Sequence, residues 1–494
     1  MSDATLAMPA APRAARPRHA RLIIAAMLIS TFMAAVEVTV ISTAMPVIVS
    51  KLGGFHLFAW AFGIYLLAQA VMTPLYGRIA DSFGRKPVYL ASTSLFLVGS
   101  LLCGCAHSMV TLIVFRAIQG IGGGGLAPLG TTIIGDVCAP EDRPRIMGYV
   151  SGVWGIAAIA GPMLGAFFVH TLGWQFCFWV NLPVGLVTMT MVWRFLRDSA
   201  QTRSRAPIDL AGCVLLVAGL GLMMAALIQC EALPTAQLVL LLAVAFVALA
   251  GFGLRERQVR HPLLPLHLMF RPLLITANLS SLLAGTLLIG MTAFLPPLIQ
   301  GVMGRDALDA GIVIGVLSVS WTIASMTIGR VVGRVPNRVL AVGAGIAMTI
   351  GMAVLVPIAD GRSLGWLTLI VIPIGIGMGL TSIVFTLAVQ GSVPAHERGR
   401  SIALFFFSRL MGQALGAAAF GGVLNAGLAD THGHDLMQAL VNPRLRAALS
   451  PAHLAAATTR LDQALHGVFV LAAVLALAAL AVACFTPRRA EQNP

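Results

Sequence analysis

Charged residues are scarce in this chain, and acidic residues are the scarcer kind. Charged side chains make up 10% of its 494 residues, with 32 Lys and Arg against 18 Asp and Glu, whereas an ordinary soluble domain carries roughly 25%. Hydrophobic residues make up 58%, and the mean hydropathy is +0.91. Too few polar side chains remain to cover a soluble protein. The composition therefore predicts an all-α protein that crosses a membrane many times.

Motifs for redox, metal and nucleotide chemistry are missing or out of place. The seven cysteines form no C-x-x-C pair and, apart from Cys138, lie in or beside apolar runs, which is typical of packing residues. The stretch GIGGGG, from Gly120 to Gly125, satisfies the dinucleotide pattern G-x-G-x-x-G. It lies inside an apolar helix with no preceding strand, so close helix packing is the favoured interpretation. We expect no cofactor and no metal.

Long apolar runs dominate what is present. Fourteen runs are each long enough to cross roughly 30 Å of hydrocarbon as a helix, and the short connections leave no room for a soluble domain. The expected spans are 22–45, 58–77, 88–106, 109–134, 146–169, 176–196, 209–229, 234–254, 272–300, 310–329, 339–358, 364–391, 401–425 and 464–485.

The basic residues test this number of spans. With the N-terminus inside, 24 of the 32 Lys and Arg fall on the inner side, six on the outer side and two within the membrane. A missed helix would exchange the sides of every later segment and remove this bias. The net charge of +14 therefore indicates membrane orientation, not nucleic-acid binding. We expect a bacterial-type inner-membrane protein with both termini cytoplasmic, its first helix an uncleaved anchor after the tail 1–21.

The longest connection, 426–463, is expected on the outer side. Ser450 followed by Pro451 is a typical helix start, which predicts a short interfacial helix there. His432 and His434 lie earlier in this segment, beside two aspartates. Because no helix fixes their geometry, a solvated loop is favoured over a metal site.

A specific motif follows the second apolar run. The text YGRIADSFGRKPVYL places Gly77, Asp81, Gly84, Arg85 and Lys86 in the pattern G-x-x-x-D-x-x-G-R-K, which resembles the signature loop of the major facilitator superfamily. Gly77 would permit close helix contact and Gly84 a tight turn, while Asp81 would pair with arginines across the turn. The resemblance implies that this loop takes part in conformational switching. We assign Asp136, near the inner end of the fourth run, to the same switching loop.

Two further segments resemble signatures of that superfamily. LIVFRAIQG in the fourth run places Arg116, Gln119, Gly120 and Gly123 on one face. In the fifth run, GIAAIAGPMLG carries Gly161, Pro162 and Gly165, which resembles the signature of antiporters rather than symporters. We expect these two glycines to let helices pack closely and the proline to bend the helix.

The remaining matches indicate one branch of this superfamily. WQFCFWVNLPVG, residues 174–185, looks like the connection between the fifth and sixth helices of the fourteen-helix drug:proton antiporters, although that family usually has Arg where this chain has Gln175. VEVTVISTAMP resembles the first-helix pattern of the branch, with Glu37 in the position of its Asp. Together with GQALG beside Arg409, the resemblance covers nearly the whole chain.

An internal repeat supports a two-part architecture. GRIADSFGRK recurs as GRVVGRVPNR: Gly77 corresponds to Gly329, and Gly333 replaces Asp81. We expect two pseudo-symmetric six-helix bundles, 22–200 and 265–485, joined by an additional helix pair at 206–257, with tails 1–21 and 486–494 and the outer loop 426–463 inside the second part. Parallel repeats of this type enclose a cavity near the membrane midplane.

Glu37 is the strongest functional candidate. It is the one acidic residue well inside a span, about fifteen residues into the first run, or roughly 22 Å of helical rise. A charge at that depth costs about 2.5–3.5 kcal/mol on insertion scales, and a low-dielectric cavity favours the protonated carboxyl group. Such a group suits a proton carrier, whereas a permanently neutral glutamate bonded to a neighbour is the alternative.

Three more polar residues and one tryptophan enter the candidate site. Arg116 lies near Glu37 and tunes its proton affinity, or it ties helices together; both interpretations stay open. Gln119, Trp154 and Arg409 are candidates for lining the cavity or gating it, and for Arg409 we favour packing or gating over substrate contact.

These observations favour a proton-coupled antiporter that exports small lipophilic compounds, including cationic ones. Because no nucleotide motif exists, an ion gradient would supply the energy, and proton entry is worth about 2.3 kcal/mol per 100 mV. The expected partners are a small-molecule substrate, protons and the lipid bilayer, with a monomer as the working unit. An importer or facilitator of a nutrient remains the alternative. A receptor or membrane enzyme is less favoured because no paired catalytic constellation lies at membrane depth.

Overall fold

A computed structural model of the chain is almost entirely helical. It describes residues 19–138, 142–197, 209–230, 233–259, 262–264, 271–328, 334–356, 363–393, 398–428 and 449–487, with Val331, Leu440 and Arg446. Within these ranges no β-strand occurs, and fourteen helical segments are long and apolar enough to cross a membrane. The predicted fold class and number of spans are confirmed. The outer-loop histidines at 432 and 434, and Gly329 and Gly333 of the repeat, lie outside the described residues.

The helices fall into a first part, an additional pair and a second part along the chain. Those of the first part are α1 (Ala20–Leu52), α2 (Phe58–Phe83), α3 (Arg85–Gly104), α4 (Met109–Val137), α5 (Arg143–Thr171), α6 (Phe176–Trp179) and α7 (Asn181–Phe195). The additional pair is α8 (Leu210–Ile228) and α9 (Thr235–Gln258). Those of the second part are α11 (Pro272–Pro297), α12 (Ala307–Ile328), α13 (Asn337–Leu355), α14 (Leu364–Ser392), α15 (Arg398–Gly427) and α18 (Pro451–Cys484).

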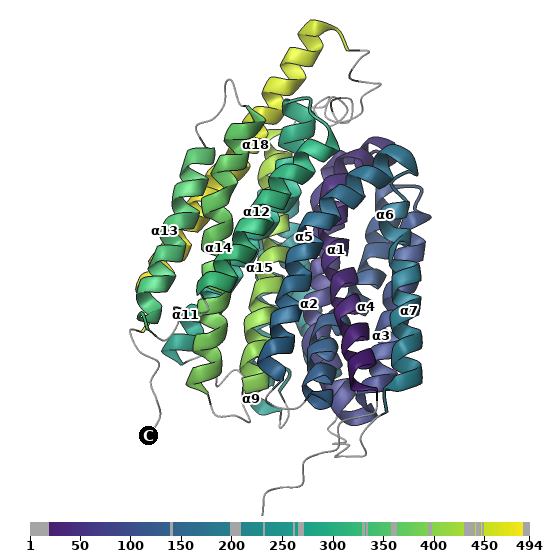
Figure 1. Cartoon of the computed structure of the whole chain (residues 1–494). Helices are drawn as coiled ribbons and strands as arrows, with labels where there is room; N and C mark the ends of the chain where they lie inside the picture. Colours follow the sequence, from purple (N-terminus) through teal and green to yellow (C-terminus); the bar gives the residue numbers. More distant parts are fainter. Residues whose placement is uncertain are drawn as a thin grey trace, which may run out of the picture.

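Two groups of helices lie beside each other in Figure 1. Helices α1 to α7 pack mainly among themselves, and so do α11 to α18. The groups meet where α5 packs on α12, α2 on α15 and α1 on α11, while α8 lies against both α2 and α15. Because α1 begins and α18 ends on the same side of the bundle, we call that side the terminal side and the other the distal side.

Helix ends follow from local sequence. The hydroxyl of Ser108 accepts a hydrogen bond from the backbone N–H of Thr111, and the Thr111 hydroxyl accepts one from the N–H of Ser108, so α4 begins with a capping box. Ser450 caps α18 with Pro451 in its first turn, as predicted. The predicted separate interfacial helix is wrong, however, because α18 continues unbroken to Cys484. The residues after Ser450 offer strong helix formers and no interior proline.

Glycines allow α4 to approach its neighbours. A Cβ atom at Gly120 would lie 2.5 Å from the carbonyl oxygen of Tyr65 on α2, and one at Gly122 would clash with the backbone of Phe96 on α3. The interpretation of the GIGGGG stretch as a packing surface is therefore confirmed. This close packing brings the polar residues of α4 within reach of α2 and α3.

Side-chain contacts tie the two parts together on the distal side. Ser42 donates a hydrogen bond to the carbonyl oxygen of Thr292, and Gln300 donates one to that of Thr43 at 3.3 Å. Phe58 and Phe294 form an edge-on ring contact, with centroids 5.7 Å apart. All these residues lie in the distal halves of α1, α2 and α11 or in the turn that follows α11. In this conformation the two parts are in direct contact on the distal side.

Candidate functional site

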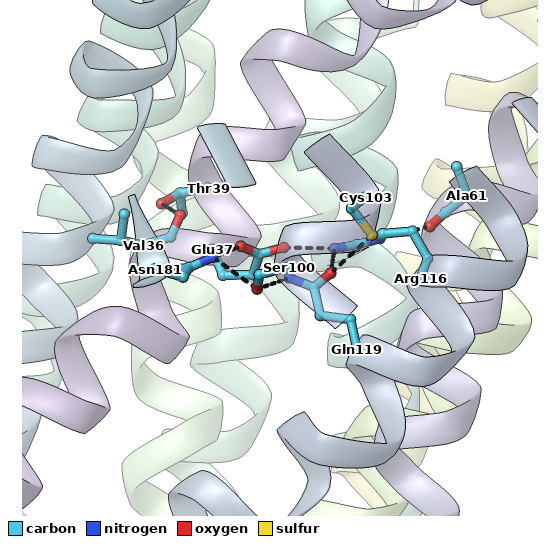
Figure 2. A network of polar contacts seen from close by, with 9 residues as sticks. All are labelled: Val36, Glu37, Thr39, Ala61, Ser100, Cys103, Arg116, Gln119 and Asn181. Atoms are coloured by element: carbon cyan, nitrogen blue, oxygen red, sulfur yellow. Dashed lines mark hydrogen bonds and ion pairs between the residues drawn. The ribbon is translucent and has the colours of Figure 1, made fainter. Parts of the chain in front are cut away.

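Five helices of the first part contribute to one buried polar network, drawn in Figure 2. Its charged members are Glu37 from α1 and Arg116 from α4. Its neutral members are Gln119 from α4, Ser100 from α3 and Asn181 from α7, with a backbone carbonyl from α2. The side chains are at most 2% exposed. Because buried polar groups are stable only when they are bonded to one another, this network holds five helices in register.

Both carboxylate oxygens of Glu37 are engaged. Oε1 lies 2.6 Å from Arg116 Nη1, and Oε2 lies 2.5 Å from Asn181 Nδ2. Asn181 Nδ2 also lies 3.4 Å from the hydroxyl oxygen of Ser100. The carboxyl group therefore has one charged and one neutral partner, on two different helices. Adding a proton to Glu37 would weaken the charged contact first, because a neutral acid attracts a guanidinium much less.

Arg116 is held by more than the glutamate. Its Nη1 also donates to Gln119 Oε1 at 2.8 Å, and its Nε donates to the carbonyl oxygen of Ala61 at 3.2 Å. The guanidinium carbon lies 4.1 Å from the centroid of the Tyr65 ring. Gln119 in turn donates to the Ser100 hydroxyl at 2.8 Å. The cation thus keeps partners on α2 and α4 when its bond to Glu37 weakens.

A helix break positions Asn181. Pro183 has no backbone N–H and cannot bond the carbonyl oxygen of Trp179 four residues earlier, so the helix divides into α6 and α7 around Val180. Asn181 is the first residue of α7 and is 1% exposed. Its amide consequently points into the first part, toward Glu37, instead of toward lipid.

Sequence reasoning did not assign three members of this network. Asn181 lies within WQFCFWVNLPVG, so a signal was present, but the motif served only to indicate the branch. Ser100 and Tyr65 carry no motif, and only the packing of α2 and α3 against α4 brings them to Arg116. The structure does bring Glu37, Arg116 and Gln119 together, as their placement on the first and fourth runs allowed.

The signature turn lies apart from this network, on the terminal side. Arg85 forms an ion pair with Asp136 at the end of α4, and the Lys86 ammonium donates to the Trp193 carbonyl oxygen at 2.7 Å. Gly84 has a φ of +97°, so the tight turn there requires glycine.

Two expectations for this turn are not met in this conformation. Asp81 is exposed and has no hydrogen bond or ion pair within the described residues, because Arg85 reaches instead to the negative end of the α4 dipole. A Cβ atom at Gly77 would meet nothing within 4 Å, so no helix approaches Gly77 closely here.

The helix 5 residues form a contact surface between helices. A Cβ atom at Gly161 would clash with Thr39 Oγ1, and one at Gly165 would clash with Thr43 Oγ1, both on α1. Pro162 faces the other way, since a Cβ atom at Gly311 of α12 would lie 3.0 Å from Pro162 Cβ. Gly161, Pro162 and Gly165 thus lie between α1 and the second part of the molecule.

The other two candidates are not members of the Glu37 network. Trp154 on α5 is 45% exposed and belongs to no described polar network. Arg409 on α15 lines a small cavity in the second part, where its guanidinium carbon lies 4.5 Å from the Trp321 ring centroid.

Comparison with known proteins agrees with the fold and the motifs. The model of the Major Facilitator Superfamily matches residues 27–417. The chain is 30% identical over 486 residues to the multidrug transporter protein MdtP of Bacillus subtilis, covering 91% of this chain and 89% of that protein. It is 32% identical to multidrug resistance protein 3 of the same organism, covering 83% and 80%. It is also 30% identical to the efflux pump dotC of Dothistroma septosporum, covering 81% and 70%.

Solved structures show the same fold at low sequence identity. A bacterial homologue of the human lysosomal transporter Spinster, in an inward-facing and occupied conformation, superposes with a TM-score of 0.68 at 14% identity, covering 95% of this chain and 97% of that one. A D-xylose–proton symporter superposes with a TM-score of 0.63 at 13% identity, covering 95% and 98%. With fourteen apolar helices in the part of it that the structure describes, and a family match over most of its length, the chain is an integral membrane transporter that belongs to the major facilitator superfamily.

Proposed function

We propose that this transporter is a proton-coupled antiporter that exports small lipophilic compounds, including cationic ones. Relatives at about 30% identity are named multidrug transporters and an efflux pump. The observation that carries the proton coupling is Glu37, which is fully buried within α1 and bonded to Arg116 and Asn181 on two other helices. A carboxyl group in that position changes the contacts of three helices when it gains or loses a proton.

Protonation of Glu37 would act first on its bond to Arg116. An ionised Glu37 binds the guanidinium at 2.6 Å, while a protonated one leaves Arg116 to Gln119, the Ala61 carbonyl and the Tyr65 ring. These other partners lower the free energy needed to break the bond between Arg116 and the carboxyl group of Glu37. Arg116 therefore acts as a counter-ion that keeps the empty proton site stable in a low-dielectric interior.

Helix α1 would carry this change to the distal side. Ser42 and Thr43, which lie less than two turns beyond Glu37, make the contacts with Thr292 and Gln300 of the second part. Gly161 and Gly165 of α5 pack on the same stretch of α1. A small shift of α1 would therefore loosen or tighten the contacts that close the distal side, which is the form of coupling that alternating access requires.

The terminal-side turn would act in the same switch. Arg85 and Lys86 hold the start of α3 to the ends of α4 and α7. These groups lie outside the apolar core and cannot touch cargo near the midplane. Breaking their contacts would let the terminal ends of the helices separate or close, without changing substrate preference. We place this side in the cytoplasm of a bacterial-type inner membrane, with a single chain as the working unit.

The alternative is an importer or facilitator of a nutrient, because the same fold serves both directions. The names of the relatives favour export. The direction of uphill transport in vesicles distinguishes the two.

The test uses inside-out membrane vesicles with an imposed proton gradient. Wild-type protein should accumulate a lipophilic dye against its gradient, Glu37→Asp should retain much of that activity, and Glu37→Gln should lose it while inserting normally. Undiminished uphill transport by the Gln variant would eliminate Glu37 as the proton carrier. Proton-driven movement of solute out of these vesicles would support the importer instead.

A further inference from the structure

We propose that the small cavity beside Arg409, in the second part of the molecule, binds a single chloride ion. The ion would supply the negative charge that the described protein groups do not place beside this arginine. This inference goes beyond the proposed export function and does not rest on it. It also departs from the sequence-based interpretation, which favoured packing or gating for Arg409.

The guanidinium of Arg409 has no polar partner among the described residues. It makes no hydrogen bond and no ion pair with them, and its one specific contact is the Trp321 ring, whose centroid lies 4.5 Å from the guanidinium carbon. A ring contact provides no acceptor oxygen, and a guanidinium carries five N–H donors. These donors therefore remain available to a ligand.

This arginine lies well inside a membrane span. The span formed by α15 covers Ser401–Gly427, so Arg409 is about 12 Å of helical rise from the nearer end of the span. A charge at such a depth is costly unless an opposite charge compensates it, and it marks a functional group.

No carboxylate of the surrounding helices pairs with Arg409. In α11, α14 and α15 there is no acidic residue, and in α12 the one acidic residue is Asp309 in the first turn. Asp309 precedes Trp321 by twelve residues, or about 18 Å of helical rise. In the first part, by contrast, Arg116 has Glu37 at 2.6 Å. The described residues thus offer no counter-charge for Arg409, and a bound anion would provide one.

The size of the cavity selects the ligand. The cavity lies between α11, α12, α14 and α15, and its volume is about 10 Å³, which is the space that one water molecule needs. Chloride is only slightly larger than a water molecule, so a small shift of a lining side chain admits it. Sulfate, an organic carboxylate and a lipid headgroup are too large. A water molecule would fill the space but would leave the charge uncompensated.

The lining of the cavity suits a chloride ion. Arg409 supplies N–H donors, and the Ser382 hydroxyl, which makes no hydrogen bond within the described residues, supplies an O–H donor. The Ser281 and Thr381 hydroxyls donate to backbone carbonyl oxygens instead, each at 2.9 Å. The remaining lining residues are apolar. Charge-assisted hydrogen bonds to an anion are strong in such low-dielectric surroundings.

Backbone packing fixes the position of the arginine. A Cβ atom at Gly285 would clash with the carbonyl oxygen of Arg409, so α11 and α15 touch at this level. A Cβ atom at Gly379 would clash with the carbonyl oxygen of Trp321, so α12 and α14 touch as well. The walls of the site are therefore formed before the ion binds, which lowers the entropy cost of binding.

The test is equilibrium binding of radioactive chloride to purified full-length protein in detergent, in a gluconate buffer free of other chloride. Wild-type protein should bind one ion per chain in a saturable manner, and unlabelled chloride should displace the label. Sulfate at equal ionic strength should not displace it, because sulfate is too large for the cavity. Absence of saturable binding would overturn the proposal, and so would displacement by sulfate as strong as that by chloride.

Variants locate the ion. Arg409→Gln should lower the chloride affinity by about 10- to 100-fold and Ser382→Ala by about 2- to 10-fold, as expected for the loss of a charged and a neutral hydrogen-bond donor. Arg409→Lys should keep much of the affinity. Arg305→Gln removes the same charge from an exposed position outside the cavity and should leave the affinity unchanged. Unchanged chloride affinity in a folded Arg409→Gln protein would refute the assignment to this cavity.

Thermal unfolding provides a second measurement without the label. Replacing chloride by gluconate at constant ionic strength should lower the unfolding midpoint of wild-type protein by about 2 °C or more, because a ligand that binds only the folded state stabilises it. The midpoint of Arg409→Gln should not respond, and an equal shift in both proteins would contradict the proposal. Because neither measurement uses a proton gradient or a transported compound, the result is independent of the vesicle test of Glu37.

Discussion

The pair of Glu37 and Arg116 allows a double-mutant cycle whose outcome depends on the buried geometry. The two charged atoms lie 2.6 Å apart, and the residues are 0% and 2% exposed. Removing one member of a buried pair costs about 3–5 kcal/mol, because the other charge is left without compensation. We therefore expect Glu37→Gln to lower the free energy of unfolding by about that amount. The double variant Glu37→Gln/Arg116→Gln leaves no charge and should lose far less than the sum of the two single changes.

The two single changes should not be equal. In Arg116→Gln the remaining carboxyl group can take up a proton and become neutral, whereas in Glu37→Gln the guanidinium stays charged at any accessible pH. Glu37→Gln should therefore be the more destabilising change. The deficit of Arg116→Gln should shrink as the pH falls, because protonating Glu37 then costs less free energy.

The measurement is reversible unfolding in mixed micelles containing increasing sodium dodecyl sulfate, followed by tryptophan fluorescence at two pH values. Arg305→Gln, a change at an exposed arginine, serves as the control for loss of a positive charge. If the two single effects add to within about 0.5 kcal/mol of the double variant, Glu37 and Arg116 do not interact in the folded protein, and the proposed counter-ion role has no basis.

Three further predictions follow from other contacts. Gly161→Ala should abolish transport at near-normal expression, because the added Cβ atom would clash with Thr39 Oγ1. Gly152→Ala on the same helix meets open space and should be tolerated. Transport assays on both variants test this, and an active Gly161→Ala protein would show that α1 and α5 do not need this close contact. Asp81→Ala should slow the export of every substrate by a similar factor, since Asp81 lies on the terminal side, away from any cargo; a changed substrate spectrum at normal rate would contradict this role. Burial acts to raise the pKa of Asp209, but hydrogen bonds from the Gly212 backbone N–H and from Arg255 hold this pKa below its usual range. The ionised carboxylate that caps α8 therefore stabilises the protein fully above about pH 4. This stabilisation is lost as the pH falls through the lowered pKa of Asp209. Asp209→Ala should accordingly cost about 1 kcal/mol at neutral pH and less in acid, and a thermal-unfolding series over pH that shows the same loss at every pH would refute this.

The number of membrane spans and the type of fold could be predicted from the amino-acid sequence. Long apolar runs have few alternatives, because backbone groups inside a bilayer must bond within their own helix. The alternation of basic residues then restricted the number of crossings, and the signature motifs at Gly84 and Gly161 indicated the superfamily. Glu37 could also be selected from sequence, since a single carboxylate within an apolar run needs a reason to be there.

The partners of Glu37 were decided by tertiary structure. Arg116 and Asn181 are 79 and 144 residues away along the chain, and no periodicity records which faces of α1, α4 and α7 meet. The helix break before Pro183 brings Asn181 close to Glu37 only because α7 packs on α1. Sequence patterns report whether one helix has an apolar face, but they do not report which neighbour covers it.

In the second part of the molecule, too, tertiary structure decided the surroundings of a charged residue, Arg409. From sequence, Arg409 and Arg116 looked alike, as two arginines inside apolar helices. Packing gives Arg116 a carboxylate and gives Arg409 only a tryptophan ring and a small cavity. The cost of a buried charge depends on the groups within a few ångströms of it, and those groups come from helices distant in sequence. The sequence could place the charges in the membrane, and only the packing of the helices decided which of them is compensated.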